Sequence, residues 1–369
     1  MTDAGAQQQH DIKLAEALVE RLLHPEASPD KDQRRVHALG ICATGAFVAS
    51  PVAADFCIAR HFRGSGDAPA PGQGPRSTRV TVRFSNGSGG AVRHDGWSDV
   101  RGMATRFHLD DATHTDLVCM TLPEFFTPTP EAFHDFAVAA YPRAFARPSP
   151  WRRLLDYLRL VPPLRPPYPG ERIRPDEGAM RYADANPHAR AAVFQAASIG
   201  APRSYVRAAY HAVHTFFVVG PDGTRRPVRF TWQPIDGVLN LDPARPEDAA
   251  LLEKDYLDAT LAERLAQGPA RFSLMMVIGE AGDDLDDCAR PWPPHRVRVN
   301  MGTLTLDALL DGEGTGDSCE LLRFNPWTLT EGIEPSGDSV LRSRRYAYEI
   351  SSAQRYAARG LPPCPFSWS

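Results

Sequence analysis

The sequence predicts an α+β protein built as an antiparallel β-barrel surrounded by helices. Three features favour this class. Several short segments alternate apolar and polar residues with a period of two, which is typical of strands with one buried face. These segments come in blocks and rarely alternate with helices, which favours antiparallel strands over a parallel βαβ arrangement. Longer segments with the apolar spacing of a helix flank the blocks, so helices are expected outside the sheet.

The first half of the chain contributes one helix and three strands to this prediction. Residues 8–24 have the pattern of an amphipathic helix, and 34–47 change from polar to apolar, so this second stretch should enter the interior. The clearest strand is Thr78 to Ser85, where Val, Val and Phe face one side and Arg, Thr, Arg and Ser face the other. Strand patterns also run from Met103 to Leu109 and from Asp116 to Thr121.

The second half supplies a hairpin, one more strand and two long helices. His214 to Val219 and Val228 to Trp232 flank a Pro-Asp-Gly-Thr turn, which is a hairpin signature. Residues 246–267 place five leucines, beginning with Leu251, on one helical stripe. Arg271 to Ile278 reads as a strand, and Asp338 to Arg355 as the last long helix.

Length and composition indicate a globular protein. The chain has 369 residues, 43% hydrophobic and 23% charged, and we interpret it as one domain over 1–369. Residues 1–28 would form a short N-terminal helix and arm, and the Pro-rich stretch 141–175 a segment that wraps the core around a short helix at 151–160. A net charge of −4 argues against a nucleic-acid partner. The short helix is interpreted as a solvated connector rather than a membrane contact.

Cysteine usage and the N-terminal residues bear on the compartment. The six cysteines are scattered without a CxxC pair, so we expect free buried thiols in a reduced, cytoplasmic setting and no cysteine-based metal site. The N-terminal residues lack the charged and apolar regions of a signal peptide, and no transmembrane span is expected.

Four segments resemble one known family. They are RRVHALG (34–40), TRVTVRFSNG (78–87), DLVCMTLPEFF (116–126) and the long stretch from Phe324 to Arg355. Their order, spacing and residue types resemble the catalase superfamily, closest to the short catalase-related peroxidases, over roughly residues 30–356. The resemblance implies a minimal catalase-like fold with one haem b per chain, without the long N-terminal arm and C-terminal extension of ordinary catalases.

On the proximal side of the haem, the resemblance assigns the iron ligand to Tyr348. A tyrosinate is an anionic ligand that favours ferric iron, and a free phenol, with a pKa near about 10, needs help to ionise. Arg344 lies four residues earlier, so on a helix the two side chains share a face. The family pattern places His214 and Asp338 behind this arginine.

On the distal side, His37 matches the histidine that moves a proton between the two peroxide oxygens, work that suits a neutral imidazole. Ser85 matches the residue that orients it, and Val36 one that narrows the access channel. The remaining matches concern haem binding: three arginines for the buried propionates and one phenylalanine that stacks on the ring, namely Arg34, Arg83, Arg355 and Phe133. Phe125 and Phe126 match channel or core aromatics.

One departure from the family pattern concerns the distal amide. Typical catalases carry Gly-Asn-Asn where this chain has Cys119-Met120-Thr121, so the distal asparagine falls on Met120, whose thioether accepts hydrogen bonds only weakly. A shift of one residue would present the Thr121 hydroxyl instead. With Met120 in place, peroxide activation should survive while rapid catalase turnover is impaired, and Met120 becomes a candidate for sulfoxide formation.

The leading function is a haem peroxidase, an oxidoreductase that cleaves hydrogen peroxide or an organic hydroperoxide through a ferryl intermediate and oxidises a small organic donor in the response to oxidative stress. Weak catalase activity, hydroperoxide rearrangement resembling the catalase-like allene oxide synthases, and a haem sensor without turnover are the alternatives. The expected partners are peroxide and the donor, with no nucleic acid or membrane, in a homodimer or monomer.

Overall fold

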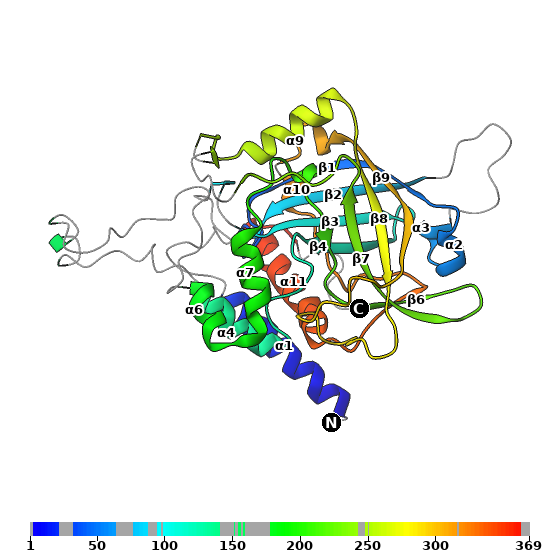
Figure 1. Ribbon diagram of the computed structural model, residues 1–369, viewed down its shortest axis with the longest axis horizontal. Coiled ribbons are helices and arrows are strands. Elements are labelled where there is room, and N and C mark those ends of the chain that lie inside the picture. The colour runs from blue at the N-terminus through cyan, green and yellow to red at the C-terminus, as the bar shows by residue number, and fades with distance from the viewer. Residues whose placement is uncertain are drawn as a thin grey trace.

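The computed structural model describes most of the chain. The described residues are 3–21, 32–63, 77–87, 94–96, 99–140, 151, 154–155, 158, 178–242, 248–249, 251–315 and 317–362. Eight antiparallel strands close into a barrel with helices around it (Figure 1), which confirms the predicted fold class. Most of the Pro-rich stretch 141–175, and the arm from residue 22, lie outside the described residues.

The barrel is closed because the last strand of the sheet order pairs back onto an earlier one. Around the barrel the strands are β1 (Gly40–Ala49), β2 (Ser77–Asn86), β3 (Arg101–His108), β4 (His114–Met120), β5 (Tyr210–His211), β7 (Arg225–Pro234), β8 (Ala270–Ile278) and β9 (Arg298–Leu309). The β7–β8 and β1–β9 pairings complete the ring. Two short strands, β6 (Phe216–Val219) and β10 (Ile333–Pro335), extend the sheet beyond β7. A closed barrel leaves no unpaired sheet edge among its own strands.

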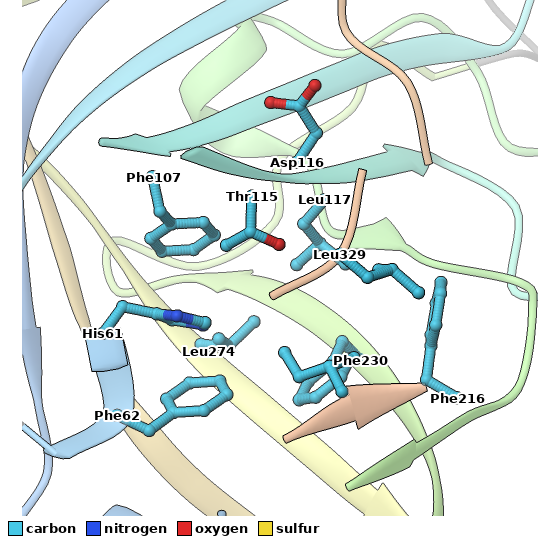
Figure 2. Close-up of a pocket in the computed structure, with 11 residues that line it drawn as sticks. His61, Phe62, Phe107, Thr115, Asp116, Leu117, Phe216, Phe230, Leu274 and Leu329 are labelled. Carbon is cyan, nitrogen blue, oxygen red and sulfur yellow. The ribbon is translucent and has the colours of Figure 1, made fainter. Parts of the chain in front are cut away.

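Aromatic side chains fill the barrel interior. The Phe47 ring meets the Phe107 ring edge-on with 5.3 Å between centroids, and Trp232 lies 6.0 Å from Phe47. A cavity of about 20 Å³ remains beside them, and Figure 2 shows that the His61 ring points into it while the Asp116 carboxylate points away. This space suits a single water molecule and no substrate. Burial lowers the pKa of His61 to about 3, so this imidazole is neutral.

Most of the longer helices gather on one side of the barrel. They are α1 (Asp3–Arg21), α4 (Pro130–Ala140), α6 (Gly178–Ala185), α7 (Arg190–Ser198) and α11 (Ser339–Ala358), as Figure 1 shows. Helix α9 (Tyr256–Gln267) lies elsewhere on the barrel, and short helices occur at α2 (Ala53–Phe56), α3 (Arg60–Arg63) and α10 (Asp317–Glu320). An ion pair between Asp11 and Arg342 Nε, at 2.7 Å, fixes α1 to α11. The helices that the structure describes include none with the length and apolar character to cross a membrane.

Most of the predicted elements agree with the structure, but one helix begins later than expected, and several elements, including α4, α6 and α7, have no counterpart in the prediction. The helix expected over 246–267 begins only at Tyr256, and Leu251 is 84% exposed because it lies in a turn before the helix. Strand β1 was expected only as an apolar stretch, and β9 was not predicted. In β1 buried residues fall on both faces, so the alternation that reveals a strand is weak. In β9 the buried Gly302, Leu304 and Leu306 alternate with more exposed residues, so this strand does carry the expected pattern.

The expectation that every cysteine is a free thiol is wrong. Cys42 on β1 and Cys319 on α10 form a disulfide across 277 residues of sequence. Their Cα atoms lie 5.7 Å apart, a separation set by the tertiary fold and invisible in sequence spacing. The three other described cysteines, Cys57, Cys119 and Cys288, are buried free thiols as expected, and Cys364 lies outside the described residues. The inference of a reduced compartment rested on six free thiols and loses that support.

Candidate functional site

A cavity of about 230 Å³ lies between the barrel and helices α1, α4 and α11. Ten of the twelve predicted site residues line it: Arg34, Val36, His37, Arg83, Ser85, Met120, Phe133, Arg344, Tyr348 and Arg355. The other two, His214 and Asp338, lie behind Arg344. The fold therefore assembles in one place residues that are up to 321 positions apart (355 − 34).

His37 is held in a fixed orientation at one side of this cavity. Its Nδ1 lies 2.9 Å from the Ser85 Oγ. Its backbone adopts the left-handed conformation with φ of 55°, and its N–H donates to the Gly87 carbonyl at 3.0 Å. Such a backbone is costly for a residue with a side chain, so the surrounding contacts must stabilise it. Burial lowers the pKa of His37 to about 4, and nearby arginines add to this effect, so the imidazole is neutral near pH 7.

Gly102 provides the surface on which the His37 ring rests. A Cβ at this position would lie 2.7 Å from His37 Nδ1 and 2.8 Å from Ser85 Oγ, closer than any side chain tolerates. Only glycine at this point of β3 leaves room for the histidine–serine pair. The role of Gly102 depends on its pairing with Ser85 across β2 and β3, and this register cannot be read from the sequence.

A row of paired residues crosses four strands at the level of His37. Ser85 on β2 pairs with Gly102 on β3, Gly102 with Met120 on β4, and Met120 with His211 on β5. Directly paired residues project to the same face of a sheet. Met120 accordingly lines the cavity.

The structure also decides between Met120 and Thr121 at this level. The Thr121 Oγ1 accepts a hydrogen bond from the Arg101 N–H at 3.0 Å, and Thr121 does not line the cavity. Met120 therefore lines the cavity at this level, and the Thr121 hydroxyl does not.

A chain of hydrogen bonds ends at the phenol of Tyr348 on the opposite side of the cavity. Arg344 Nη2 donates to the Tyr348 oxygen at 2.6 Å, and Arg344 Nη1 lies 2.8 Å from His214 Nε2. His214 Nδ1 lies 2.6 Å from Asp338 Oδ2. Because Arg344 can only donate, His214 Nε2 accepts and Nδ1 carries the proton toward Asp338.

Asp338 has a second function at the start of α11. Its Oδ1 accepts the backbone N–H groups of Val340 at 2.8 Å and Leu341 at 3.2 Å, as an N-cap does. Burial alone would raise the pKa of Asp338, but the His214 ring and these two donors outweigh it and hold the pKa below its usual value. Burial lowers the pKa of His214, so the ring between carboxylate and guanidinium is neutral.

Three predicted arginines meet at one edge of the cavity, together with a carboxylate that sequence reasoning missed. Glu320 on α10 accepts from Arg34 Nη1 at 2.6 Å and from Arg83 Nη2 at 3.0 Å. Burial would raise the pKa of Glu320, but the Arg83 and Arg34 charges lower it instead. Arg355 lies close enough to contribute to the same effect. Glu320 has no marked sequence context, so only its contacts identify it.

The charge at this edge fits a ligand with two carboxylates. Three guanidinium groups face one carboxylate among these four side chains, which leaves two positive charges to compensate. The buried Nε atoms of Arg83 and Arg355 have no hydrogen-bond partner among the residues that the structure describes. Buried charged donors require partners, and the two propionates of the haem that the sequence implies would supply them. Burial lowers the pKa of Arg355 to about 10, as expected of a cation lacking full compensation.

Apolar side chains complete the cavity. Phe133 on α4 and Phe125 after β4 line it with 4.8 Å between their ring centroids. Phe126 does not, because its ring stacks on Phe136 at 4.6 Å, and it belongs to the core. Leu18 and Val19 of α1 also line the cavity, a contribution that the helical pattern of this segment did not reveal.

Comparison with known proteins gives a consistent result. A family model described as catalase matches residues 7–163 and 167–360. A catalase-related peroxidase of Mycolicibacterium paratuberculosis is 32% identical over 86% of this chain and 87% of its own length. A catalase-related peroxidase of Synechococcus elongatus is 29% identical over 89% of this chain and 84% of its own length.

Two solved structures that share this fold are larger proteins. A bacterial catalase superposes with a TM-score of 0.71 at 20% identity, over 93% of this chain and 61% of that protein. Catalase A from Saccharomyces cerevisiae gives 0.70 at 21% identity, over 90% and 64%. The chain thus spans about three fifths of the solved catalases that share its fold.

Proposed function

This chain belongs to the catalase family, and from that premise we propose that it is a haem-dependent peroxidase that uses hydrogen peroxide or an organic hydroperoxide to oxidise a small organic donor. The catalase-related peroxidases to which this chain is similar indicate that it is an oxidoreductase acting on peroxide. Membership of the catalase family implies a haem cofactor. The haem, proposed as one haem b per chain, would supply the iron centre at which the peroxide O–O bond breaks.

The residues that would hold the haem form two groups. Tyr348 is the proposed iron ligand, and Arg344 donates a 2.6 Å hydrogen bond to its oxygen. The neutral His214 and the Asp338 carboxylate keep this guanidinium aimed at Tyr348. Two propionates would take up the free Nε donors of Arg83 and Arg355.

His37 is the proposed acid–base group on the other face. With Nδ1 protonated and donating to the Ser85 Oγ, the ring keeps a lone pair on Nε2. Nε2 would take the proton from the inner peroxide oxygen and return it to the outer oxygen, so that water leaves. Its depressed pKa, about 4, keeps the ring ready for this transfer above acidic pH.

Met120 favours peroxidase over catalase turnover. A second hydrogen peroxide molecule needs a polar group to orient it when it acts as reductant, and the thioether at this position offers a weak acceptor and no donor. Catalase activity is therefore proposed to be weak.

One observation carries this proposal: the His37–Ser85 pair and the Arg344–Tyr348 pair face the same cavity. Stopped-flow spectroscopy of the haem-loaded protein with hydrogen peroxide and with cumene hydroperoxide tests it, with oxygen release followed in parallel. His37→Ala should slow the reaction with peroxide by at least about a hundredfold. The exposed His188 provides a control, and His188→Ala should react at the native rate. A native rate in His37→Ala would show that the assigned acid–base group is wrong.

A further inference from the structure

A second histidine lies in the wall of the same cavity. His211 on β5 is the direct strand partner of Met120 on β4, and both side chains line the cavity. Because paired residues of antiparallel strands project to one face, the imidazole lies beside the thioether. Neither the haem anchors nor the proton transfer at His37 uses this ring.

The His211 ring is fixed at one nitrogen and open at the other. Its Nδ1 lies 3.1 Å from the Oγ1 of Thr231, the residue paired with it on β7. No hydrogen bond joins Nε2 to any residue that the structure describes. Burial lowers the pKa of His211 to about 4, and Arg298 adds to the effect, so the ring is neutral near pH 7.

The surroundings of His211 are apolar, which makes its open nitrogen unusual. Met120 and Val213 flank it along the cavity wall, and Phe125 lies in the same wall. Polar groups in a buried wall usually have a hydrogen-bond partner, and Nε2 has none among the described residues. An imidazole with one fixed nitrogen presents the other in a defined direction, as groups that bind a polar ligand do.

We propose that His211 binds the hydroxyl group of a phenolic electron donor, whose ring lies against Met120. A thioether makes favourable contacts with aromatic rings, and the apolar wall accommodates the rest of the donor. Thr231 can donate to Nδ1 or accept from it, so Nε2 can serve the hydroxyl in either role. This inference rests on the proposed function and names its reducing substrate class.

The proposed role includes the proton of the oxidised donor. When the peroxide-oxidised enzyme withdraws one electron from the phenol, the O–H bond breaks. The electron would pass to the haem centre and the proton to His211 Nε2, and a phenoxyl radical would leave. His211 would then pass this proton on to the remaining peroxide oxygen before a second phenol repeats the step, so that two donors supply the two electrons and two protons with which that oxygen leaves as water. His37 handles the peroxide protons and His211 the donor proton.

The test separates donor binding from peroxide chemistry. The dissociation constant of guaiacol is measured from the spectral shift of the ferric haem protein, for the native chain and for His211→Phe and His211→Gln. His211→Phe should weaken guaiacol binding by about tenfold, the effect of one lost hydrogen bond, whereas His211→Gln should retain most of the affinity. Veratrole, in which a methyl group blocks the hydroxyl, should bind the native chain and His211→Phe alike. The rate of the first reaction with peroxide should be unchanged in both variants.

The outcomes distinguish this inference from the proposed function. Equal guaiacol affinity in the native chain and His211→Phe, with normal peroxide reaction, overturns the role of His211 and leaves the peroxidase intact. An equal loss for guaiacol and veratrole also overturns it, because a shape change then explains the effect. Failure of the native protein to react with peroxide overturns the proposed function, whatever the binding data show. Thr231→Val, which removes the Nδ1 partner, provides a second variant and should weaken guaiacol binding more than veratrole binding.

Discussion

The guanidinium of Arg344 donates to the phenol oxygen of Tyr348 at 2.6 Å from one turn earlier on the same helix. Behind it, His214 and Asp338 complete a relay of three short contacts from a helix cap to the cavity. The Tyr348 side chain, which lines the cavity, is thus held by the Arg344 guanidinium and by His214 and Asp338 behind it. This arrangement separates the group that would hold the iron from the groups that fix its position.

Replacing Tyr348 by phenylalanine removes the phenol oxygen, which is the proposed iron ligand. The haem-loaded variant is expected to lose the charge-transfer absorption of a tyrosinate complex and to release haem at least about tenfold faster, since a metal–ligand bond is lost. Absorption spectra and transfer of haem to apomyoglobin measure both effects. Tyr346→Phe, two residues earlier and outside the cavity lining, should behave as the native chain does.

The cap and the charge of Asp338 can be measured separately. Asp338→Ala removes both and should lower the free energy of unfolding by about 1 kcal/mol from the cap alone. Asp338→Asn retains a capping oxygen but loses the charge and the oxygen that accepts from His214 Nδ1. Urea denaturation of the three proteins gives the two contributions, and an equal loss in both variants would show that the cap contributes nothing.

Acid should remove the charge contribution of Asp338. The pKa of Asp338 in the folded state lies below its ordinary value of 3.8. The ionised carboxylate therefore stabilises the fold fully above about pH 4, and this stabilisation is lost as the pH falls through the folded-state pKa. The difference in unfolding free energy between the native chain and Asp338→Asn should therefore be constant near neutrality and shrink below pH 4. Denaturation curves collected from pH 7 to pH 3 test this, and a difference that grows in acid would contradict it.

Adding a methyl group at Gly102 should displace His37. The new carbon would lie 2.7 Å from Nδ1, so the ring must move, at a cost of roughly 1–3 kcal/mol in stability. Gly102→Ala is expected to react with peroxide far more slowly than Ser85→Ala, which removes the hydroxyl without crowding. Stopped-flow rates and thermal denaturation of both variants provide the comparison. Equal rates would mean that His37 tolerates a different position.

Restoring an amide at position 120 should increase catalase turnover. Met120→Asn places a donor and an acceptor beside Gly102 and His37. One added hydrogen bond to the peroxide should increase the rate of oxygen release from hydrogen peroxide by about tenfold. Met120→Leu, which retains an apolar side chain, should leave oxygen release at the native level. An oxygen electrode measures both variants, and equal rates in them would assign the weak catalase activity to another residue.

Neutralising Glu320 should destabilise the haem-free protein more than the haem-loaded one. Glu320→Gln leaves the Arg34 and Arg83 charges without a carboxylate, and breaking such a pair costs up to about 3 kcal/mol when it is largely shielded from water. Two propionates would compensate part of this charge. Thermal unfolding with and without haem should show the larger loss without it. Equal losses in both forms would place the arginines outside the propionate site.

The parts of the site that follow from local spacing could be predicted from the sequence. Arg344 and Tyr348 share a helix face because they are four residues apart, and Arg83 and Ser85 share a strand face because they are two apart. The strand and helix bounds around them agree with the apolar patterns to within a few residues.

The parts that depend on tertiary contacts could not be predicted. The place of Glu320 among the arginines, the fit of Gly102 under His37, and the neighbour of Met120 on β5 all follow from register and packing between distant segments. No spacing along the chain encodes these contacts.

The bridge between Cys42 and Cys319 has a consequence for the integrity of the molecule. It encloses the whole barrel apart from the first residues of β1 in one covalent ring, with His37 just before it and Tyr348 beyond it. A protein cut once by a protease between residues 42 and 319 would remain one covalent molecule that still carries both segments. Only a thiol reductant would separate the two pieces. Closing a ring of this length also restricts the unfolded chain, by up to about 5 kcal/mol, so the nicked and intact forms should both lose resistance to heat when reduced.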